Sequence, residues 1–129
     1  MTNSFSDFRI LVAPGLHGSG PGHWQTRWER LYPQFERIEQ QHWDQPDLKA
    51  WSERVGQALR SSARPALVVA HSFGCLATIR AAAAGAPALF GALLVAPASP
   101  DKFGLARELA PLALAVPTIL VGSRNDPWL

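Results

Sequence analysis

The sequence predicts an α/β protein with a mostly parallel β-sheet and helices on both faces of that sheet. Short β-rich runs alternate with longer segments of helical periodicity, which is typical of βαβ units. Several of the runs are almost continuously apolar, as expected for strands that are buried on both faces. The 129 residues fit one domain, and no repeat or interdomain linker divides residues 1–129.

Five short runs are the predicted strands of this sheet. They combine β-branched or other apolar residues with lengths typical of buried strands. They cover residues 9–13, 35–40, 67–70, 92–95 and 118–122.

The segments between these runs carry the predicted helices, over residues 24–32, 48–59 and 73–84, with residues 101–112 helical in part. Asp47 is well placed to cap the second helix. Gly85, followed by Ala-Pro, supplies the stop signal of the third.

Apolar residues at helical spacing indicate which helix faces point inward. Trp24, Trp28 and Leu31 share one face of the first helix, and Trp51 lies on the apolar face of the second. We therefore expect the tryptophans to pack in the core rather than to stack on a ligand. Cys75 is expected to be a small buried apolar residue rather than a reactive thiol.

Composition and charge exclude several classes of protein. The net charge is +2 and the basic residues are dispersed, so the chain has no basic patch for nucleic acid or an anionic membrane. The single cysteine excludes an internal disulfide and fits the reducing cytoplasm. The polar first residues argue against a signal peptide, and Pro or Gly interrupts every apolar stretch well before the ~20 residues of a membrane helix.

The run Ala70-His71-Ser72-Phe73-Gly74 joins an apolar strand to a helical stretch. A serine between small residues at such a junction is typical of a nucleophile elbow, a tight turn that holds a catalytic hydroxyl above an α/β sheet. Ala70 and Gly74 meet its need for small residues two positions before and after the serine. The alternative is a serine at a helix N-terminus without chemistry.

A glycine-bearing loop, Pro14-Gly15-Leu16-His17-Gly18-Ser19-Gly20, directly follows the first predicted strand. A serine nucleophile needs donors for the oxyanion, and in this arrangement they are the backbone N–H after the nucleophile and one from such a loop. Phe73 and Leu16 are the candidates. A phosphate cradle is the rival interpretation, but the loop lacks the required lysine and glycine spacing, and a plain strand–helix turn is the third.

A serine nucleophile also needs a base and an acid. Asp126, in the turn after the last predicted strand, follows Ser72 in the chain order that this fold requires, although Asn-Asp-Pro is also ordinary turn chemistry. That order places the histidine after the acid, and the three residues after Asp126 include none. His17 could approach Ser72 against the expected order, and the three other histidines, His23, His42 and His71, are weaker candidates.

Five motifs in sequence resemble one family, the small serine hydrolases of the retinoblastoma-binding-protein-nine and YdeN type. The match covers essentially the whole chain. The motifs are Ile10-Leu11-Val12-Ala13-Pro14-Gly15, Gly18-Ser19-Gly20-Pro21-Gly22-His23-Trp24-Gln25, Trp43-Asp44-Gln45-Pro46-Asp47, the serine turn, and Asn125-Asp126-Pro127-Trp128.

The resemblance implies an α/β-hydrolase fold with Ser72 as nucleophile, Asp126 as triad acid, and the Leu16 and Phe73 backbone as oxyanion hole. It implies no metal and no organic cofactor. Family members continue through a further helix, a last strand and a loop with the catalytic histidine. We therefore expect a chain truncated at its C-terminus, an incomplete domain that lacks the final strand and helix. Alone it should be nearly inactive, with residues 118–122 as an exposed apolar edge.

The sequence thus predicts a serine hydrolase, esterase-like, that cleaves a small ester, thioester or amide through an acyl-enzyme. Gly15, His17 and Ser99 are expected to contact the substrate, since ligands in open α/β sheets bind at the carboxyl ends of the strands. Asp44 could reach the site but is interpreted as a turn residue. One alternative is a non-catalytic module that binds a protein partner, and another is a cofactor-free lyase or perhydrolase on the same fold.

Overall fold

Within the described residues the sheet has five strands, all parallel, in the order β2-β1-β3-β4-β5. The computed structural model describes residues 7–112 and 114–122. The predicted α/β class with a parallel sheet is confirmed. The strands are β1 (Arg9–Ala13), β2 (Glu36–Arg37), β3 (Ala66–His71), β4 (Leu89–Val95) and β5 (Thr118–Val121).

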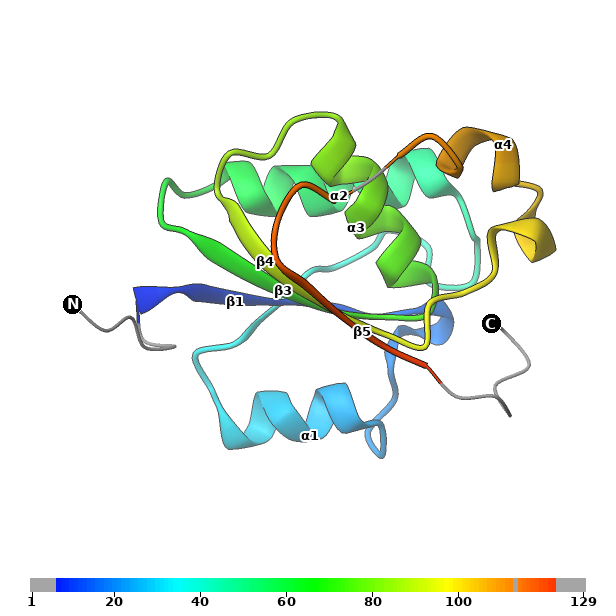
Figure 1. Cartoon of the computed structure of the whole chain (residues 1–129). Helices are drawn as coiled ribbons and strands as arrows, with labels where there is room; N and C mark the ends of the chain where they lie inside the picture. Colours follow the sequence, from blue (N-terminus) through cyan, green and yellow to red (C-terminus); the bar gives the residue numbers. More distant parts are fainter. Residues whose placement is uncertain (1–6, 113, 123–129) are drawn as a thin grey trace.

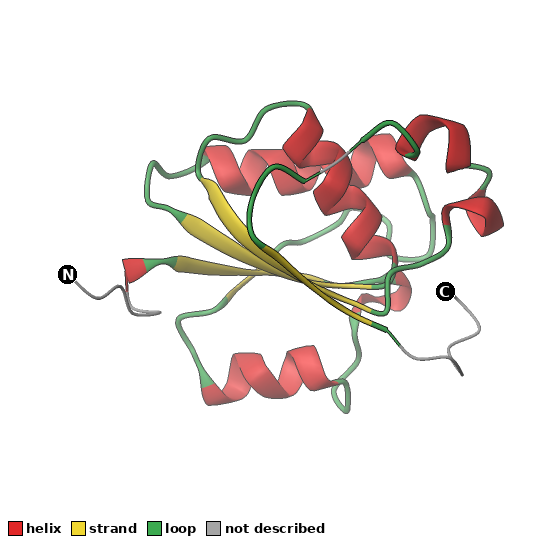
Figure 2. Cartoon of the chain, in the orientation of Figure 1, coloured by secondary structure: helices red, strands yellow, loops and turns green. Residues whose placement is uncertain are grey.

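Helices cover both faces of the sheet, as the sequence predicts (Figures 1 and 2). One helix, α1, lies on one face, and α2, α3 and α4 lie on the other. Short 3₁₀ helices follow β1 and β4. The α-helices are α1 (Trp24–Leu31), α2 (Leu48–Arg60), α3 (Phe73–Ala83) and α4 (Ala106–Leu109), and the 3₁₀ helices are η2 (Leu16–Gly18) and η3 (Pro100–Phe103).

Local signals account for the helix ends. The Asp47 carboxylate accepts a hydrogen bond from the Ala50 N–H at 3.1 Å, so the predicted cap of α2 is confirmed. After α3, Gly85 adopts a left-handed φ of 103°, which a residue with a side chain adopts only with strain. No helix in the described part of the chain has the length and apolarity required to cross a membrane.

Two predicted elements are longer than those observed. The predicted strand 35–40 contributes only Glu36–Arg37 to the sheet, because its partner β1 is followed by Pro14, which has no N–H to extend the ladder. The predicted helix 101–112 is divided into η3 and α4 by Gly104, whose left-handed φ of 69° ends the first turn.

The expectation that the apolar face of α1 lies in the core is wrong. Trp28 and Leu31 are 36% and 70% exposed, and the buried residue of α1 is Gln25. Among the described residues, α1 is the only helix on its face of the sheet. The side of α1 that points away from the sheet therefore has no neighbouring helix to pack against. Trp24 is half-buried and contacts the Trp28 ring at 4.9 Å between centroids.

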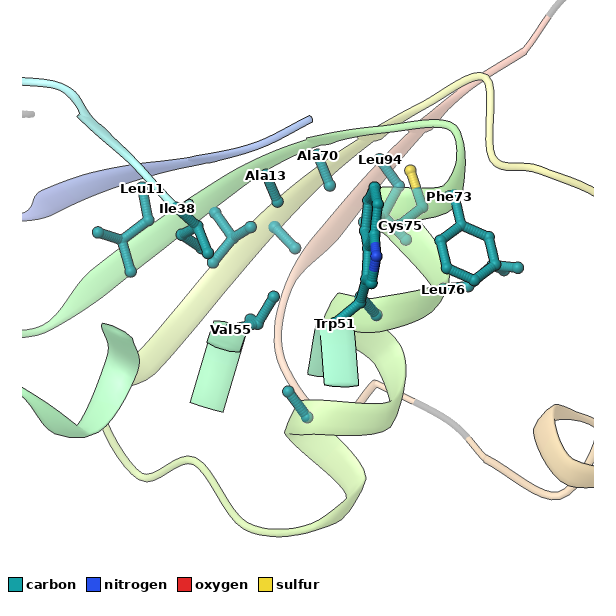
Figure 3. Close-up of a cluster of buried hydrophobic side chains, with 14 of the residues drawn as sticks. Leu11, Ala13, Ile38, Trp51, Val55, Ala70, Phe73, Cys75, Leu76 and Leu94 are labelled. Atoms are coloured by element: carbon teal, nitrogen blue, oxygen red, sulfur yellow. The ribbon is translucent and has the colours of Figure 1, made fainter. Parts of the chain in front are cut away.

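The main core lies on the other face, between the sheet and helices α2 and α3 (Figure 3). Trp51 of α2 packs edge-on against Phe73 of α3 with 5.1 Å between ring centroids, and both side chains are fully buried. Cys75 is buried in the same cluster, as predicted. This packing fixes the start of α3, the helix that directly follows Ser72.

At one edge of the described sheet, β5 leaves large apolar side chains uncovered. Ile119 and Leu120 are about two-thirds exposed, at 66% and 68%. Phe90 on β4 is also exposed. The exposed apolar edge predicted for residues 118–122 is therefore present along Thr118–Val121.

Candidate active site

Ser72 lies in the turn that leads from β3 directly into α3. Its φ of 53° and ψ of −120° lie in a region that residues with a side chain rarely adopt. The turn is tight on the α3 side: a Cβ placed on Gly74 would approach the Ala13 carbonyl oxygen to 2.3 Å. Glycine is thus required at position 74 by contact with the end of β1.

The loop after β1 is in direct contact with this turn. A Cβ placed on Gly15 would lie 2.9 Å from the Ser72 Cβ and 3.2 Å from the His71 carbonyl oxygen. The two loops also flank a switch in the topology, because β1 is followed by α1 on one face of the sheet and β3 by α3 on the other (Figure 1). Such a switch point, at the carboxyl ends of adjacent parallel strands, is where ligands bind in open α/β folds.

Two backbone N–H groups near Ser72 are available as donors. Phe73 is the first residue of α3, so its N–H precedes the helical hydrogen-bond pattern, and Leu16 begins η2 beside Gly15. Neither N–H donates to an acceptor within residues 7–112 and 114–122. The positive end of the α3 dipole also points to this place, where negative charge is stabilised.

A third loop, after β4, is bonded to the same turn. The Ala98 N–H donates to the Ser72 carbonyl oxygen at 3.2 Å, and the Ser72 N–H donates to the Val95 carbonyl oxygen at 3.1 Å. Ser99 follows in this loop and is half-buried. The structure therefore brings Gly15, Leu16, Phe73 and the loop of Ser99 together around Ser72. Asp126 lies outside the described residues.

His17, His23 and His71 contact other side chains. His17, at the rim of the loop after β1, donates a hydrogen bond from Nδ1 to the Asp44 carboxylate at 2.7 Å, and both side chains are exposed. Asp44 lies in a turn, as the sequence predicts, and its carboxylate also pairs with His17 across two loops. His23 and His71 pack against each other with 4.4 Å between ring centroids, and His42 lies in the loop after β2.

His23 has an altered proton affinity. Burial, then the neighbouring His71 and Arg37, lowers the pKa of His23 from 6.5 to about 4. Its Nδ1 accepts a hydrogen bond from the Gln25 N–H at 3.2 Å, which caps α1 and requires the neutral ring. His23 is therefore a neutral, structural acceptor at pH 7.

Two open hollows lie elsewhere on the described part of the molecule. One of about 320 Å³ lies between the loop after β2 and the start of α2, and its lining includes His42 and Gln45. Another of about 500 Å³ lies beside the C-terminal end of α2, lined by Leu59 and Pro87 among others. Neither is lined by Ser72 or by the loop after β1. Among the described residues, no group of three or more His, Cys, Asp or Glu side chains could hold a metal ion.

Sequence reasoning missed the polar residues behind the site. Gln25 is fully buried and hydrogen-bonded to Ser19, and Arg37 donates to the Gly18 carbonyl oxygen. Gln25 belongs to one of the motifs that carry the family resemblance. Its burial could not be predicted from the helical pattern, because that pattern assigns the inward face of α1 to the apolar residues. Arg37 gave no signal, because a basic residue in a short strand is ordinarily solvated.

Comparisons with known proteins agree on one class. The sequence matches the family described as serine hydrolase over residues 10–129. The fold is similar to the crystal structure of a protein from Pectobacterium atrosepticum described as a YdeN-like hydrolase, with a TM-score of 0.91 and 35% identity. The match covers 96% of this chain and 67% of that one. Among curated proteins, none matches the chain.

Proposed function

The chain belongs to the serine hydrolase family, and from that premise we propose that it cleaves a small ester, thioester or amide through an acyl-enzyme on Ser72. The observation that carries the proposal is the contact between the strained Ser72 turn and the Gly15 loop. It brings a hydroxyl nucleophile beside two backbone N–H groups that have no acceptor among the described residues. This is the combination that acyl transfer requires.

In the first half of the reaction, the Ser72 hydroxyl attacks the substrate carbonyl carbon and gives its proton to a histidine base. The Leu16 and Phe73 N–H groups donate to the oxyanion of the tetrahedral intermediate. The intermediate collapses, the bond to the leaving group breaks, and the departing alcohol, thiol or amine takes the proton from the histidine. The acyl group then remains on the Ser72 oxygen.

In the second half, the same base removes a proton from water, which attacks the acyl carbon. Collapse of the second intermediate releases the carboxylic acid and returns the proton to Ser72. We propose that the base is a histidine beyond Leu129, oriented by Asp126. The exposure of the His17–Asp44 pair, which makes no hydrogen bond to Ser72 within the described residues, and the packing of His23 against His71 support this assignment.

The substrate would lie over the carboxyl ends of β1, β3 and β4. Gly15 allows the carbonyl group of the substrate to approach Ser72 closely, because a side chain at position 15 would occupy the space beside Ser72. We propose that His17, in the loop after β1, and Ser99, in the loop after β4, contact the remainder of the substrate. No metal or organic cofactor takes part in this scheme.

A non-catalytic binding module is disfavoured by the backbone of Ser72. A positive φ on a residue with a side chain costs about 1–3 kcal/mol, and residues strained in this way cluster at active sites. A surface that only binds a protein gains nothing from such strain in a half-buried turn.

The test is ester hydrolysis by the natural protein, purified at its full length. We expect turnover of p-nitrophenyl acetate or butyrate that Ser72→Ala reduces by at least about 10³-fold. Ser62→Ala is the matched control, because Ser62 lies in the loop before β3. That loop is at the amino ends of the strands, whereas Ser72 is at their carboxyl ends. Turnover that survives Ser72→Ala, or falls equally in both variants, would contradict the proposal.

A further inference from the structure

The loop that carries the Leu16 N–H has a strained backbone. His17, Gly18 and Ser19 follow one another with φ values of 69°, 78° and 50°, all in the left-handed region. Only Gly18 adopts such a conformation freely, so the other two residues are strained. A conformation of this kind persists where surrounding contacts hold it, and the loop should therefore have identifiable anchors.

The first anchor is the buried amide of Gln25. Its Oε1 accepts a hydrogen bond from the Ser19 hydroxyl at 2.6 Å. Its Nε2 donates to the Val69 carbonyl oxygen at 3.0 Å and to the Ala13 carbonyl oxygen at 3.4 Å. The side chain is 0% exposed, and both ends of the amide are engaged.

These three partners belong to the two segments that form the site. Ala13 ends β1, three residues before Leu16, and Ser19 lies three residues after it. Val69 belongs to β3, three residues before Ser72. One amide therefore bridges both sides of the Leu16 loop and the strand that carries Ser72.

A second anchor restrains the same loop from α1 and β2. The Thr26 hydroxyl donates to the Ser19 carbonyl oxygen at 2.6 Å. Arg37 donates to the Gly18 carbonyl oxygen and, at 2.8 Å, to the Thr26 hydroxyl. Arg37 is itself held by the Glu29 carboxylate at 2.9 Å. These contacts restrain the outer side of the loop, whereas Gln25 holds its inner side to the sheet.

We infer that Gln25 is a positioning residue that sets the distance between the Leu16 and Phe73 N–H groups, an inference that rests on the function proposed above. Packing alone does not require an amide here, since an apolar side chain of similar size would be buried without the cost of removing polar atoms from water. The amide is distinguished from such a side chain by its hydrogen bonds to Ser19, Ala13 and Val69. Their geometry is directional, so they fix the loop against β3.

The test compares Gln25→Leu with wild type in the full-length protein. Leucine fills most of the space of glutamine but makes none of its hydrogen bonds. We expect kcat for p-nitrophenyl butyrate to fall about 10- to 100-fold, because small displacements of catalytic groups have effects of this size. KM should change less than about threefold. Gln57→Leu, at an exposed position on α2, is the control and should behave as wild type.

Hydrogen exchange separates positioning from loss of structure. In Gln25→Leu, peptides that cover residues 14–22 and 70–76 should exchange faster, while α2 keeps its protection. Wild-type kcat in folded Gln25→Leu would overturn the inference. A fall in kcat accompanied by equally faster exchange throughout the sheet and α2 would also overturn it, because the role would then be general stability.

Ser19→Ala keeps the inference testable if Gln25→Leu does not fold. It removes only the hydroxyl that donates to the Gln25 amide, and we expect a smaller fall in kcat, about 3- to 10-fold, with KM again unchanged. An unchanged kcat in Ser19→Ala would then overturn the inference. Failure of the proposed function is detected by a separate measurement: the wild-type protein would then show no Ser72-dependent ester turnover. In that case the inference about Gln25 fails as well.

Discussion

The backbone of Gly15 lies against the side chain of Ser72, so closely that a Cβ on Gly15 would be 2.9 Å from the Ser72 Cβ. This contact ties the loop after β1 to the turn after β3. In the proposed mechanism the distance between the nucleophile and one oxyanion donor depends on it. The chain offers a direct test, because Gly20 of the same loop has open space around it.

Gly15→Ala should reduce kcat for ester hydrolysis by about 10²-fold, since the added methyl group must displace either the loop or the nucleophile. The matched control is Gly20→Ala, because a Cβ on Gly20 would have no other heavy atom within 4 Å. Steady-state kinetics of the full-length protein measure both variants. Equal activity of the two would show that the contact has no catalytic consequence.

Gly74→Ala should destabilise the fold rather than merely slow the reaction. Its Cβ would come within 2.3 Å of the Ala13 carbonyl oxygen and 2.6 Å of the Pro14 carbonyl oxygen, and these backbone atoms cannot move without shifting β1. We expect a loss of roughly 1–3 kcal/mol or more in the free energy of unfolding, measured in urea. Gly22→Ala has no such neighbour and serves as control. A midpoint for Gly74→Ala equal to that of the control would contradict the observed packing.

Cys75 should be chemically inert in the folded protein. Burial raises the pKa of its thiol to about 12, and the side chain is fully enclosed behind the Ser72 turn. The reactive thiolate is therefore scarce at pH 8 and inaccessible. Iodoacetamide at this pH should modify Cys75 only after denaturation, as followed by intact mass. Rapid modification of the native protein would refute this description of the core.

The stability of the protein should decrease in mild acid because of His23. Its pKa is 6.5 when unfolded and about 4 when folded, so between these values the unfolded state binds more protons. The contribution of neutral His23 to the free energy of unfolding is therefore fully present above pH 6.5 and declines as the pH falls toward 4. His23→Asn keeps a capping acceptor for α1 without a titrating ring and should show a shallower decline in urea midpoint. Parallel curves for the two proteins would exclude His23 as the cause.

The exposed edge strand should promote self-association of this chain. Ile119 and Leu120 on β5 are largely exposed, and an uncovered apolar edge is a site for pairing with another strand. Ile119→Lys should keep the 129-residue chain monomeric at concentrations at which the unsubstituted chain forms larger species, as measured by light scattering. A monodisperse, monomeric unsubstituted chain would contradict this expectation.

The parallel sheet could be predicted from the sequence because its signals are local. Nearly continuous apolar strands, the Asp47 cap and the Gly85 stop each act within a few residues, and all correspond to observed elements. The Gly-rich loop and the serine turn could be expected to meet, since parallel strands end at the same edge.

Other features depend on contacts that the sequence pattern does not encode. Trp28 and Leu31 have helical apolar spacing but lie exposed, because burial depends on which neighbours a helix has. The same limit concealed Gln25, whose partners Ala13 and Val69 are distant in sequence, and the His17–Asp44 pair, which joins two separate loops. Long-range hydrogen bonds of this kind become visible only once the strands are placed side by side.

The most direct test of the central claim is to treat the full-length protein with a fluorophosphonate probe and map the adduct by peptide mass spectrometry. Our account predicts a single adduct on Ser72, at a rate far above that of free serine, which Ser72→Ala abolishes and Ser62→Ala leaves unchanged. An unmodified protein, or an adduct on another serine such as Ser99, would show that Ser72 is not the nucleophile.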